Sequence, residues 1–571
     1  MDERHRVEFR CNGTLVSVDT APGESLLSVL RERLGLRSVK DGCAPQGQCG
    51  CCTVLVDDAA RVACVTPATR VAGREVTTVE GLAPSQRAEL TDAFVATGGS
   101  QCGFCTPGIL MRAAALHARE TIDGPAVDRA LAAHLCRCTG WRTVIDAIGA
   151  PRPPGPARRL DAAARRATLE GGVPQRVGPA VPLGEAGFAD DGAPDGALVA
   201  VPLPAGSDAT ALDAVGMRWV VAPTLHEARG LAAKVQGRRS TRDDAAPLPL
   251  PVRPPGGVRL VTGWVEPAYL EPDASWCEPG GSPASPLANG GAFGAKVVSA
   301  APAAARALAD QLGRAVRVFY SREDVVRLGA KRPPIAATAH VADRTLDVAG
   351  TYIGGPIAWD PDPPVSNLTV EERWEAVRRP GPPTSPALRA FPLAERTVLR
   401  EGAVTEAGLS RDALDRDERV AATRLLTVAA TAGGALGGAR VELAPATGAL
   451  TRVEVRVAAG DPLDEVVLRS YCIGAAHMAL GWVLTETIAV DPSSGEVLDL
   501  TIRSFGILRA RSTPPIDVTI VDDPGPPRSR GGDSVFAAVA AATWEAVTAF
   551  AGTRPETFPA RGTAAARAAR T

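Results

Sequence analysis

Lysine, an excess of basic charge and long apolar runs are scarce or absent in this chain, and each absence narrows the functions that we expect of the protein. Only four lysines stand against 58 arginines, and the 571 residues carry a formal net charge of −2 with a pI near 6.4. A chain without a basic excess is not expected to bind nucleic acid or anionic lipid. No stretch approaches about 18 consecutive apolar residues, so we expect no membrane-spanning helix and no membrane partner.

The beginning of the chain also lacks the features of an export signal. Residues 1–5 read Met-Asp-Glu-Arg-His, with neither an apolar core nor a twin-arginine segment. This favours a cytoplasmic location. The chain is too long for one hydrophobic core, and we expect about three or four domains.

Cysteine, in contrast, is present in an informative pattern. Of twelve cysteines, eight form two groups of four within the first 138 residues. The first group is a C-x5-C-x2-C run that begins at Cys43 and is followed by Cys64, close to the spacing of plant-type ferredoxins. The second joins a C-x2-C pair at Cys102 to a C-x-C pair at Cys136. The remaining four are interpreted as buried or incidental thiols: Cys11, Cys51, Cys277 and Cys472.

Each group has the composition of a site for a 2Fe–2S cluster, which four cysteine thiolates hold. The alternative is a pair of zinc sites, because zinc is also bound by four cysteines. Zinc ribbons prefer two C-x2-C pairs, whereas the second group contains a C-x-C pair and the first group is asymmetric. We therefore expect two iron–sulfur clusters and a role in electron transfer.

The order of patterns predicts an α+β protein of several domains, of which the first covers residues 1–81. Alternating segments flank Asn12-Gly13, a strong signal for a hairpin turn. Short strands are expected over residues 53–56 and 62–65 after the cysteine loop. These features predict a small mixed α/β domain.

Residues 82–150 switch to helical patterns. Thr106 is expected to cap a helix whose first residue is Pro107. Residues 151–182 are rich in proline, glycine, alanine and arginine and are predicted to be a linker. Residues 183–571 alternate strand-like and helical segments and read as a larger α+β region.

The motifs together resemble a known family. Residues 101–108 read QCGFCTPG and residues 136–141 read CRCTGW. With the preceding cysteine loop, this order is similar to the iron–sulfur part of the xanthine dehydrogenase / aldehyde oxidoreductase family of molybdenum hydroxylases, over about residues 5–150. The resemblance implies a β-grasp ferredoxin domain followed by a four-helix domain, each with one 2Fe–2S cluster.

The resemblance also implies which sulfurs bind iron. The implied ligands are Cys43, Cys49, Cys52 and Cys64 in the first domain and Cys102, Cys105, Cys136 and Cys138 in the second. The first gap holds five residues where the family usually has four. Cys51 falls at a variable position of the family and is not counted as a ligand.

The later part of the chain resembles the molybdopterin-binding part of the family in separate pieces. GGAFGAK at residues 290–296, LRAF at 388–391 and the stretch 474–486 occur in the family's order. The family's general base is a glutamate in a GxKGxGE motif, which takes a proton from metal-bound water or hydroxide. In the stretch 528–534 that position falls on Ser534 or, with a shift of one residue, on Asp533, which is shorter by about one methylene.

A second loss agrees with the first. The glutamine that lies near the cofactor in the family falls on Met478, whose thioether is a poor replacement for an amide. His477 is interpreted as a packed residue rather than a metal ligand. We therefore expect residues 183–571 to be a degenerate molybdopterin-binding-like region, with no catalytic residue and no molybdopterin on this chain.

Three functions are compatible with this pattern. The favoured hypothesis is an electron-transfer subunit that relays electrons from a molybdenum-containing catalytic partner to an FAD subunit or another acceptor. No GxGxxG follows a clear strand, so FAD is not expected on this chain. The alternatives are a self-contained molybdenum hydroxylase with a reduced active site and a non-catalytic assembly or redox-sensing subunit. Purine, aldehyde, carbon monoxide and N-heterocycle substrates all remain open.

One residue outside the cysteines is a candidate for cofactor binding. Gln101 precedes Cys102, in a region that faces the pterin in the family. It is predicted to face the cofactor of a partner. The alternative is a hydrogen bond at a helix end.

Overall fold

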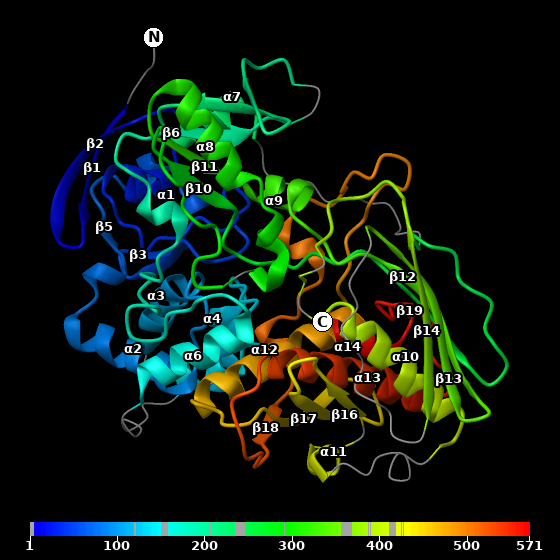
Figure 1. Cartoon of the computed structure of the whole chain (residues 1–571). Coiled ribbons are helices and arrows are strands. Elements are labelled where there is room, and N and C mark those ends of the chain that lie inside the picture. The colour runs from blue at the N-terminus through cyan, green and yellow to red at the C-terminus, as the bar shows by residue number, and fades with distance from the viewer. Residues whose placement is uncertain are drawn as a thin grey trace.

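The computed structural model describes residues 5–570 except 119–121, 150–157, 205–206, 235–245, 291, 356–367, 386, 389, 410–417, 424 and 426. The described residues of the segment 5–149 gather on one side of the molecule, and the later elements lie against them (Figure 1). Two helices, α12 (Glu465–Leu484) and α13 (Gly531–Ala551), have the length and apolar composition of a membrane span, and most of each is buried inside the fold.

A mixed sheet forms the first part of the chain. Its strand order is β2-β1-β5-β3-β4, with β1 antiparallel to β2 and parallel to β5. The β1–β2 turn is made by Asn12 and Gly13 at φ 51° and 80°, the left-handed conformation that an Asn-Gly hairpin turn requires. The strands are β1 (His5–Cys11), β2 (Thr14–Thr20), β3 (Thr53–Val56), β4 (Ala59–Val62) and β5 (Glu75–Thr77).

One strand prediction in this part was wrong. Residues 53–56 form β3 as expected, but β4 occupies Ala59–Val62, and Ala63–Val65 is a turn of 3-10 helix. The reason is local: two residues at positive φ, Asp57 and Asp58, turn the chain back at once, so the pairing strand begins earlier. Cys64 therefore lies just beyond a strand.

Helix α1 (Leu26–Ser28), which continues as a π-helical turn, lies between β2 and β3, and the longer helices of this part follow the sheet. The longer helices are α2 (Pro84–Thr97), α3 (Thr106–His117), α4 (Gly124–Leu131) and α5 (Arg142–Gly149). Helix α3 begins one residue earlier than predicted, with Cys105 rather than Thr106 at the cap position. The Thr106 hydroxyl contacts the Ser100 hydroxyl at 2.9 Å, so it does not cap the helix.

The segment predicted to be a linker contains a helix, which corrects that prediction. Helix α6 (Leu160–Gly171) buries Ala163 and Ala167 against α12. The buried residues of α6 recur at helical spacing, but the arginines and glycines around them obscure this pattern in the sequence. At least residues 160–171 are therefore part of the packed structure.

The remainder of the described chain builds further sheets. The first has the order β10-β11-β6-β8-β7 and is accompanied by α7–α9. Its elements are β6 (Leu198–Pro202), β7 (Leu212–Ala214), β8 (Met217–Ala222), α7 (Leu225–Leu231), β10 (Ala274–Cys277), α8 (Ala301–Leu312), β11 (Val316–Phe319) and α9 (Arg322–Leu328).

Two more sheets have the orders β14-β13-β12-β9-β19 and β15-β16-β17-β18. Their strands are β9 (Val258–Thr262), β12 (Ile335–Ala342), β13 (Thr345–Ile353), β14 (Thr369–Val377), β15 (Thr427–Ala430), β16 (Leu436–Leu443), β17 (Leu450–Ala458), β18 (Ile516–Ile520) and β19 (Thr557–Phe558). The helices are α10 (Leu393–Glu406), α11 (Glu418–Thr423), α12 (Glu465–Leu484), α13 (Gly531–Ala551) and α14 (Ala564–Arg570).

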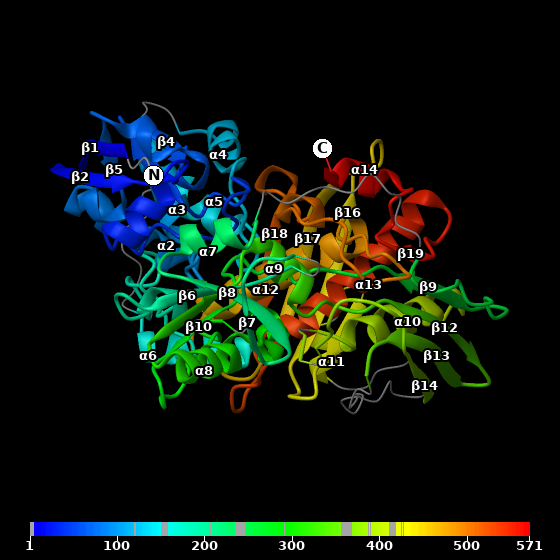
Figure 2. The ribbon, with the colours of Figure 1, turned by 90° about the horizontal axis from the view of Figure 1, so that it is seen from above.

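Helices α12 and α13 form the centre of this larger part (Figure 2). They pack on each other, and α13 also packs on α10 and β16. Both are apolar nearly all round, as expected of helices surrounded by protein. Helix α12 also contacts α2 and α6, so it links the two sides of the molecule.

A buried ion pair joins the second cysteine region to the larger part. Arg137 donates two hydrogen bonds to the carboxylate of Glu486, at 2.6 and 2.7 Å, and a third to the carbonyl of Pro267 at 2.9 Å. The two side chains are 6% and 2% exposed. Near this pair, Gly474 of α12 packs against the backbone of Cys138, because a Cβ at position 474 would lie 1.8 Å from the carbonyl oxygen of Cys138.

Replacing Arg137 by methionine would leave the Glu486 carboxylate buried without its partner. We expect R137M to lower the free energy of unfolding by about 3–5 kcal/mol, measured by urea titration. The double variant R137M/E486M removes both charges and should recover most of the loss. As a control, R306M breaks an exposed pair with Asp310 and should change stability by less than about 1 kcal/mol. Equal losses in the single and double variants would contradict this account.

Candidate functional site

The first cysteine group lies in the loop before β3 and in the 3-10 turn after β4. Backbone N–H groups of Gln48 and Cys49 donate to the sulfur of Cys43 at 3.3 Å, and that of Cys64 donates to Cys52 at 3.4 Å. Thiol contacts connect Cys49 to Cys43, Cys43 to Cys64 and Cys64 to Cys52. The contact with Cys49 holds the pKa of the Cys43 thiol well below its usual range.

The second group lies where α2 and α3 meet the loop before α5. The sulfurs of Cys102 and Cys138 are 3.5 Å apart. Cys105 contacts Cys136, and this contact lowers the pKa of the Cys136 thiol to about 6 despite its burial. The structure therefore brings together the four cysteines of each predicted set, as a chain of contacts in the first group and as two pairs in the second.

Both arrangements fit a 2Fe–2S cluster. Such a cluster contains two irons bound by four cysteines, so its ligand sulfurs come in pairs. A structural zinc ion would need four ligands around one centre. No three His, Cys, Asp or Glu side chains converge on a single ion position among the residues that the structure describes.

The two cysteine groups are neighbours. Helix α3 begins directly after Cys105 and approaches the first loop so closely that a Cβ on Gly108 would lie 2.3 Å from the carbonyl oxygen of Gly50 and 2.8 Å from that of Cys51. The buried Cys51 thiol contacts Cys49. It is also close enough to Cys105 to contribute to the raised pKa of the Cys105 thiol. The two cysteine groups are therefore close in space, with Gly108 packed directly against the first loop.

A buried histidine that the sequence did not single out also lies here. His134 packs against Gly50, and its ring nitrogens have no hydrogen-bond partner among the described residues. Burial lowers the pKa of His134 to about 3, so its ring is neutral. An orphaned ring N–H next to the first cysteine loop is a donor of the kind that cluster sulfurs accept.

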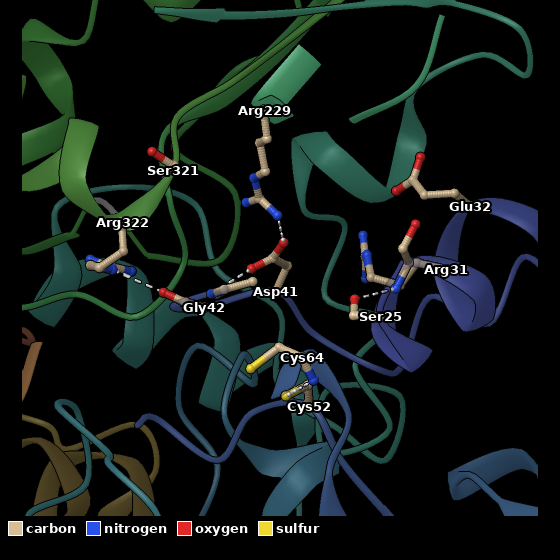
Figure 3. Close-up of polar contacts among 12 residues, drawn as sticks. Ser25, Arg31, Glu32, Asp41, Gly42, Cys52, Cys64, Arg229, Ser321 and Arg322 are labelled. Carbon is tan, nitrogen blue, oxygen red and sulfur yellow. Dashed lines mark hydrogen bonds and ion pairs between the residues drawn. The ribbon is translucent and has the colours of Figure 1, made fainter. Parts of the chain in front are cut away.

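The larger part of the chain holds the first cysteine loop from the other side (Figure 3). Arg229 of α7 pairs with Asp41 at 2.8 Å. Arg322 of α9 donates to the carbonyl of Gly42 at 2.9 Å and to those of Tyr269 and Leu270 at 2.9 and 2.7 Å. The residues just before Cys43 are therefore fixed by elements that lie far away in the sequence.

A cavity of about 140 Å³ adjoins the second cysteine group. Its wall includes the cysteines themselves, the end of α6, a loop at residues 289–294 and the start of α13. The loop is strained, because Asn289, Ala292 and Phe293 have φ of 42°, 49° and 58°. The Asn289 amide donates to the carbonyls of Gln101 and Cys102 at 3.1 Å and so ties this loop to the cysteines.

Gln101 lines the cavity, but its amide nitrogen already has partners. It donates to the carbonyl of Cys138 at 2.9 Å and contacts the carbonyl and hydroxyl of Ser470 at 3.1 and 2.9 Å. These bonds join the second cysteine group to α12. A role of Gln101 toward a cofactor stays a prediction.

Two glutamates in the cavity wall were missed at the level of sequence. Glu271 pairs with Lys296 at 2.8 Å, and its second oxygen is buried without a hydrogen-bond partner. Burial raises the pKa of Glu271 to about 7. Glu170, at the end of α6, accepts hydrogen bonds from the first residues of α13. No local motif marks either residue, since each acquires its role from distant segments.

The structure also places the residues considered for the family's base. Asp533 lies in the cavity wall and is 5% exposed, whereas Ser534 is buried and donates to the carbonyl of Gly531 at 2.7 Å. Met478 lies on α12 and is buried in the hydrophobic core. His477 is fully buried beside it, with one ring nitrogen 3.1 Å from the carbonyl of Leu508.

The cavity fits a phosphate-bearing pterin cofactor poorly. Its volume is comparable with that of an engineered cavity that binds one benzene ring. Glu170, Glu271 and Asp533 line it together with Arg137 and Arg530, but Arg137 is already paired with Glu486, and Glu170 occupies the start of α13. An anionic cofactor needs donors and positive charge in such a place.

Substitution of single cysteines tests the two ligand sets. C105S should lower the iron content from about four to about two atoms per chain, because the second cluster loses a ligand while the first keeps all of its own. C51S, the matched control, should keep all the iron. Iron assays and visible spectra of the purified variants measure this. Iron loss in C51S equal to that in C105S would contradict the assignment.

Comparisons with known proteins match two separate stretches within the first 149 residues. Residues 9–69 match the family described as "2Fe-2S iron-sulfur cluster binding domain", and residues 78–149 match "[2Fe-2S] binding domain". The Escherichia coli O157:H7 protein named xanthine dehydrogenase iron-sulfur-binding subunit is 38% identical over 146 residues, which is 25% of this chain and 91% of that protein. The nicotine 6-hydroxylase small subunit of Paenarthrobacter nicotinovorans is also 38% identical, over 26% of this chain and 88% of its own.

The whole chain also has a structural counterpart. The aldehyde oxidoreductase of Desulfovibrio gigas superposes with a TM-score of 0.71 at 15% identity, over 99% of this chain and 100% of that one. At that identity the likeness shows the fold alone. The two cysteine groups, the two matched domains and the similarity to iron–sulfur subunits lead to one conclusion: this chain belongs to the xanthine dehydrogenase / aldehyde oxidoreductase family of molybdenum hydroxylases.

Proposed function

We propose that this chain is the electron-transfer subunit of a molybdenum hydroxylase. Residues 82–150 receive electrons at the second cluster and residues 1–81 pass them on from the first. The observation that carries the proposal is that the two cysteine groups are neighbours: Gly108, three residues after Cys105, packs against the backbone of Gly50 and Cys51 in the first cysteine loop. The clusters supply one-electron redox chemistry when bound, and the chain's residues hold their sulfurs at adjacent positions.

The surrounding residues support this role in specific ways. Backbone N–H groups already point at the sulfurs of Cys43 and Cys52, and such hydrogen bonds raise a cluster's reduction potential. Arg137, between two cysteines of the second group, is fixed by Glu486. The cluster loops therefore need little rearrangement when an electron arrives.

The proposal includes partners and a location. A molybdenum-containing catalytic subunit supplies electrons, and an FAD subunit or another acceptor removes them. The relatives named as iron–sulfur or small subunits support a multisubunit assembly. Residues 183–571 serve as a degenerate molybdopterin-binding-like scaffold in this proposal, and the protein is cytoplasmic.

One observation favours a second function. Asp533 lines the cavity beside the second cysteine group, near the position where the family has its base. This supports a self-contained molybdenum hydroxylase with a reduced active site. We rank it second because the small cavity with several carboxylates in its wall suits an anionic cofactor poorly.

Stopped-flow reduction of the complex purified with its native partners tests the relay. With limiting dithionite, electron paramagnetic resonance should show two distinct reduced clusters, and added cytochrome c should reoxidise both. In C138S, which disrupts the second cluster, reduction of the first cluster by the partner's substrate should fall to the rate without substrate.

The matched control for that experiment is C51S, which should relay at the wild-type rate. Unchanged reduction of the first cluster in a C138S complex that lacks the second cluster would contradict the proposed path. Purine or aldehyde oxidation by the isolated chain with an artificial acceptor would favour the second function instead.

A further inference from the structure

The end of α6 closes one side of the cavity. Helix α6 is anchored on α12 by apolar contacts, and beyond it the hydroxyl of Tyr471 donates to the side chain of Gln175 at 2.6 Å. Glu170, Gly171 and Gly172 then form part of the cavity wall. The segment that connects the iron–sulfur part to the rest of the chain thus reaches the site where the fold would hold a cofactor.

Glu170 binds the start of α13 with both carboxylate oxygens. One accepts the N–H of Gly531 at 3.2 Å, and the other accepts the N–H of Gly532 at 2.8 Å. Arg166, one turn earlier on α6, lies 3.5 Å from the same carboxylate, and both side chains are fully buried. Arg166 also donates to the carbonyl of Arg528 at 2.6 Å, which fixes the chain before the helix.

The start of a long helix is a natural site for an anion. The first N–H groups of a helix have no partner within it, and the helix dipole places partial positive charge there. Phosphate and carboxylate groups bind at such positions for both reasons. Helix α13 runs for 21 residues, and here a carboxylate of the same chain takes the anion's place.

A second atom in the same cavity indicates that a ligand position exists. The free oxygen of Glu271 is buried without a hydrogen-bond partner among the described residues, although the residue is 9% exposed and lines the cavity. Such an orphaned acceptor is costly unless a donor reaches it. The hydroxyl of hydrogen phosphate, which keeps a proton at neutral pH, is a donor of that kind.

We propose that Glu170 is an internal anion that occupies an oxyanion site at the start of α13 and so excludes phosphate- or oxometal-bearing groups from the cavity. The proposal deepens the function proposed above and rests on it only in the claim that this chain holds no pterin cofactor. Removal of the Glu170 carboxylate should uncover the site. The chemical class that then binds is a tetrahedral oxyanion.

The test compares the iron-loaded full chain with its E170A variant. Equilibrium dialysis against molybdate, and separately against inorganic phosphate, measures binding directly. E170A should bind about one oxyanion per chain, and its Tm should rise with oxyanion concentration by mass action. Wild type should bind at least about tenfold more weakly, since one charge at a helix terminus changes affinity by this order.

Two further variants separate this effect from a general loss of stability. E395A removes another fully buried carboxylate, which pairs with Arg332 outside the cavity wall, and should bind no oxyanion. The double variant R166M/E170A leaves no unpaired buried charge and serves if E170A loses its iron. The oxyanion affinity of this double variant should be higher than that of wild type but lower than that of E170A, because the nearby cation, Arg166, is gone.

Two results would overturn the proposal. One is wild type that binds molybdate or phosphate as tightly as E170A does. The other is an iron-loaded E170A or R166M/E170A chain that binds neither. The binding assay involves no electron flow, so it can fail while the relay holds, and the relay can fail while the assay succeeds.

Discussion

The ion pair between Arg137 and Glu486 is the buried contact that fixes the second cysteine group against the larger part of the chain. Arg137 stands between Cys136 and Cys138, so the pair fixes the backbone that carries two cysteines of the second group. Burying both charges is costly, and only good geometry with further hydrogen bonds offsets that cost. The bidentate contact and the bond to Pro267 supply both.

This contact gives the later part of the chain a physical task that does not depend on catalysis. Glu486 follows α12, and α12 also touches Cys138 through Gly474 and holds Gln101 through Ser470. Other elements of this part fix the loop before Cys43. In the proposed account, a domain that has lost its chemistry is retained because the cluster loops are built against it.

How much of this could be predicted from the sequence follows from the range of each interaction. The Asn12-Gly13 turn, the strand over residues 53–56 and the two cysteine groups depend on spacing within a short segment, and the structure has them. The helical α6 and the role of Glu170 depend on α12 and α13, hundreds of residues away, and no local pattern reveals them. Asp533 and Ser534 were equivalent in the sequence, and only the fold separates the one in the cavity wall from the one in the core.

Metal analysis of the isolated, freshly purified chain tests the central claim most directly. The account predicts about four iron atoms per chain, as two 2Fe–2S clusters require, and no stoichiometric molybdenum. One molybdenum per chain, together with the iron, would contradict it, because the cavity would then hold the cofactor that Glu170 is proposed to exclude.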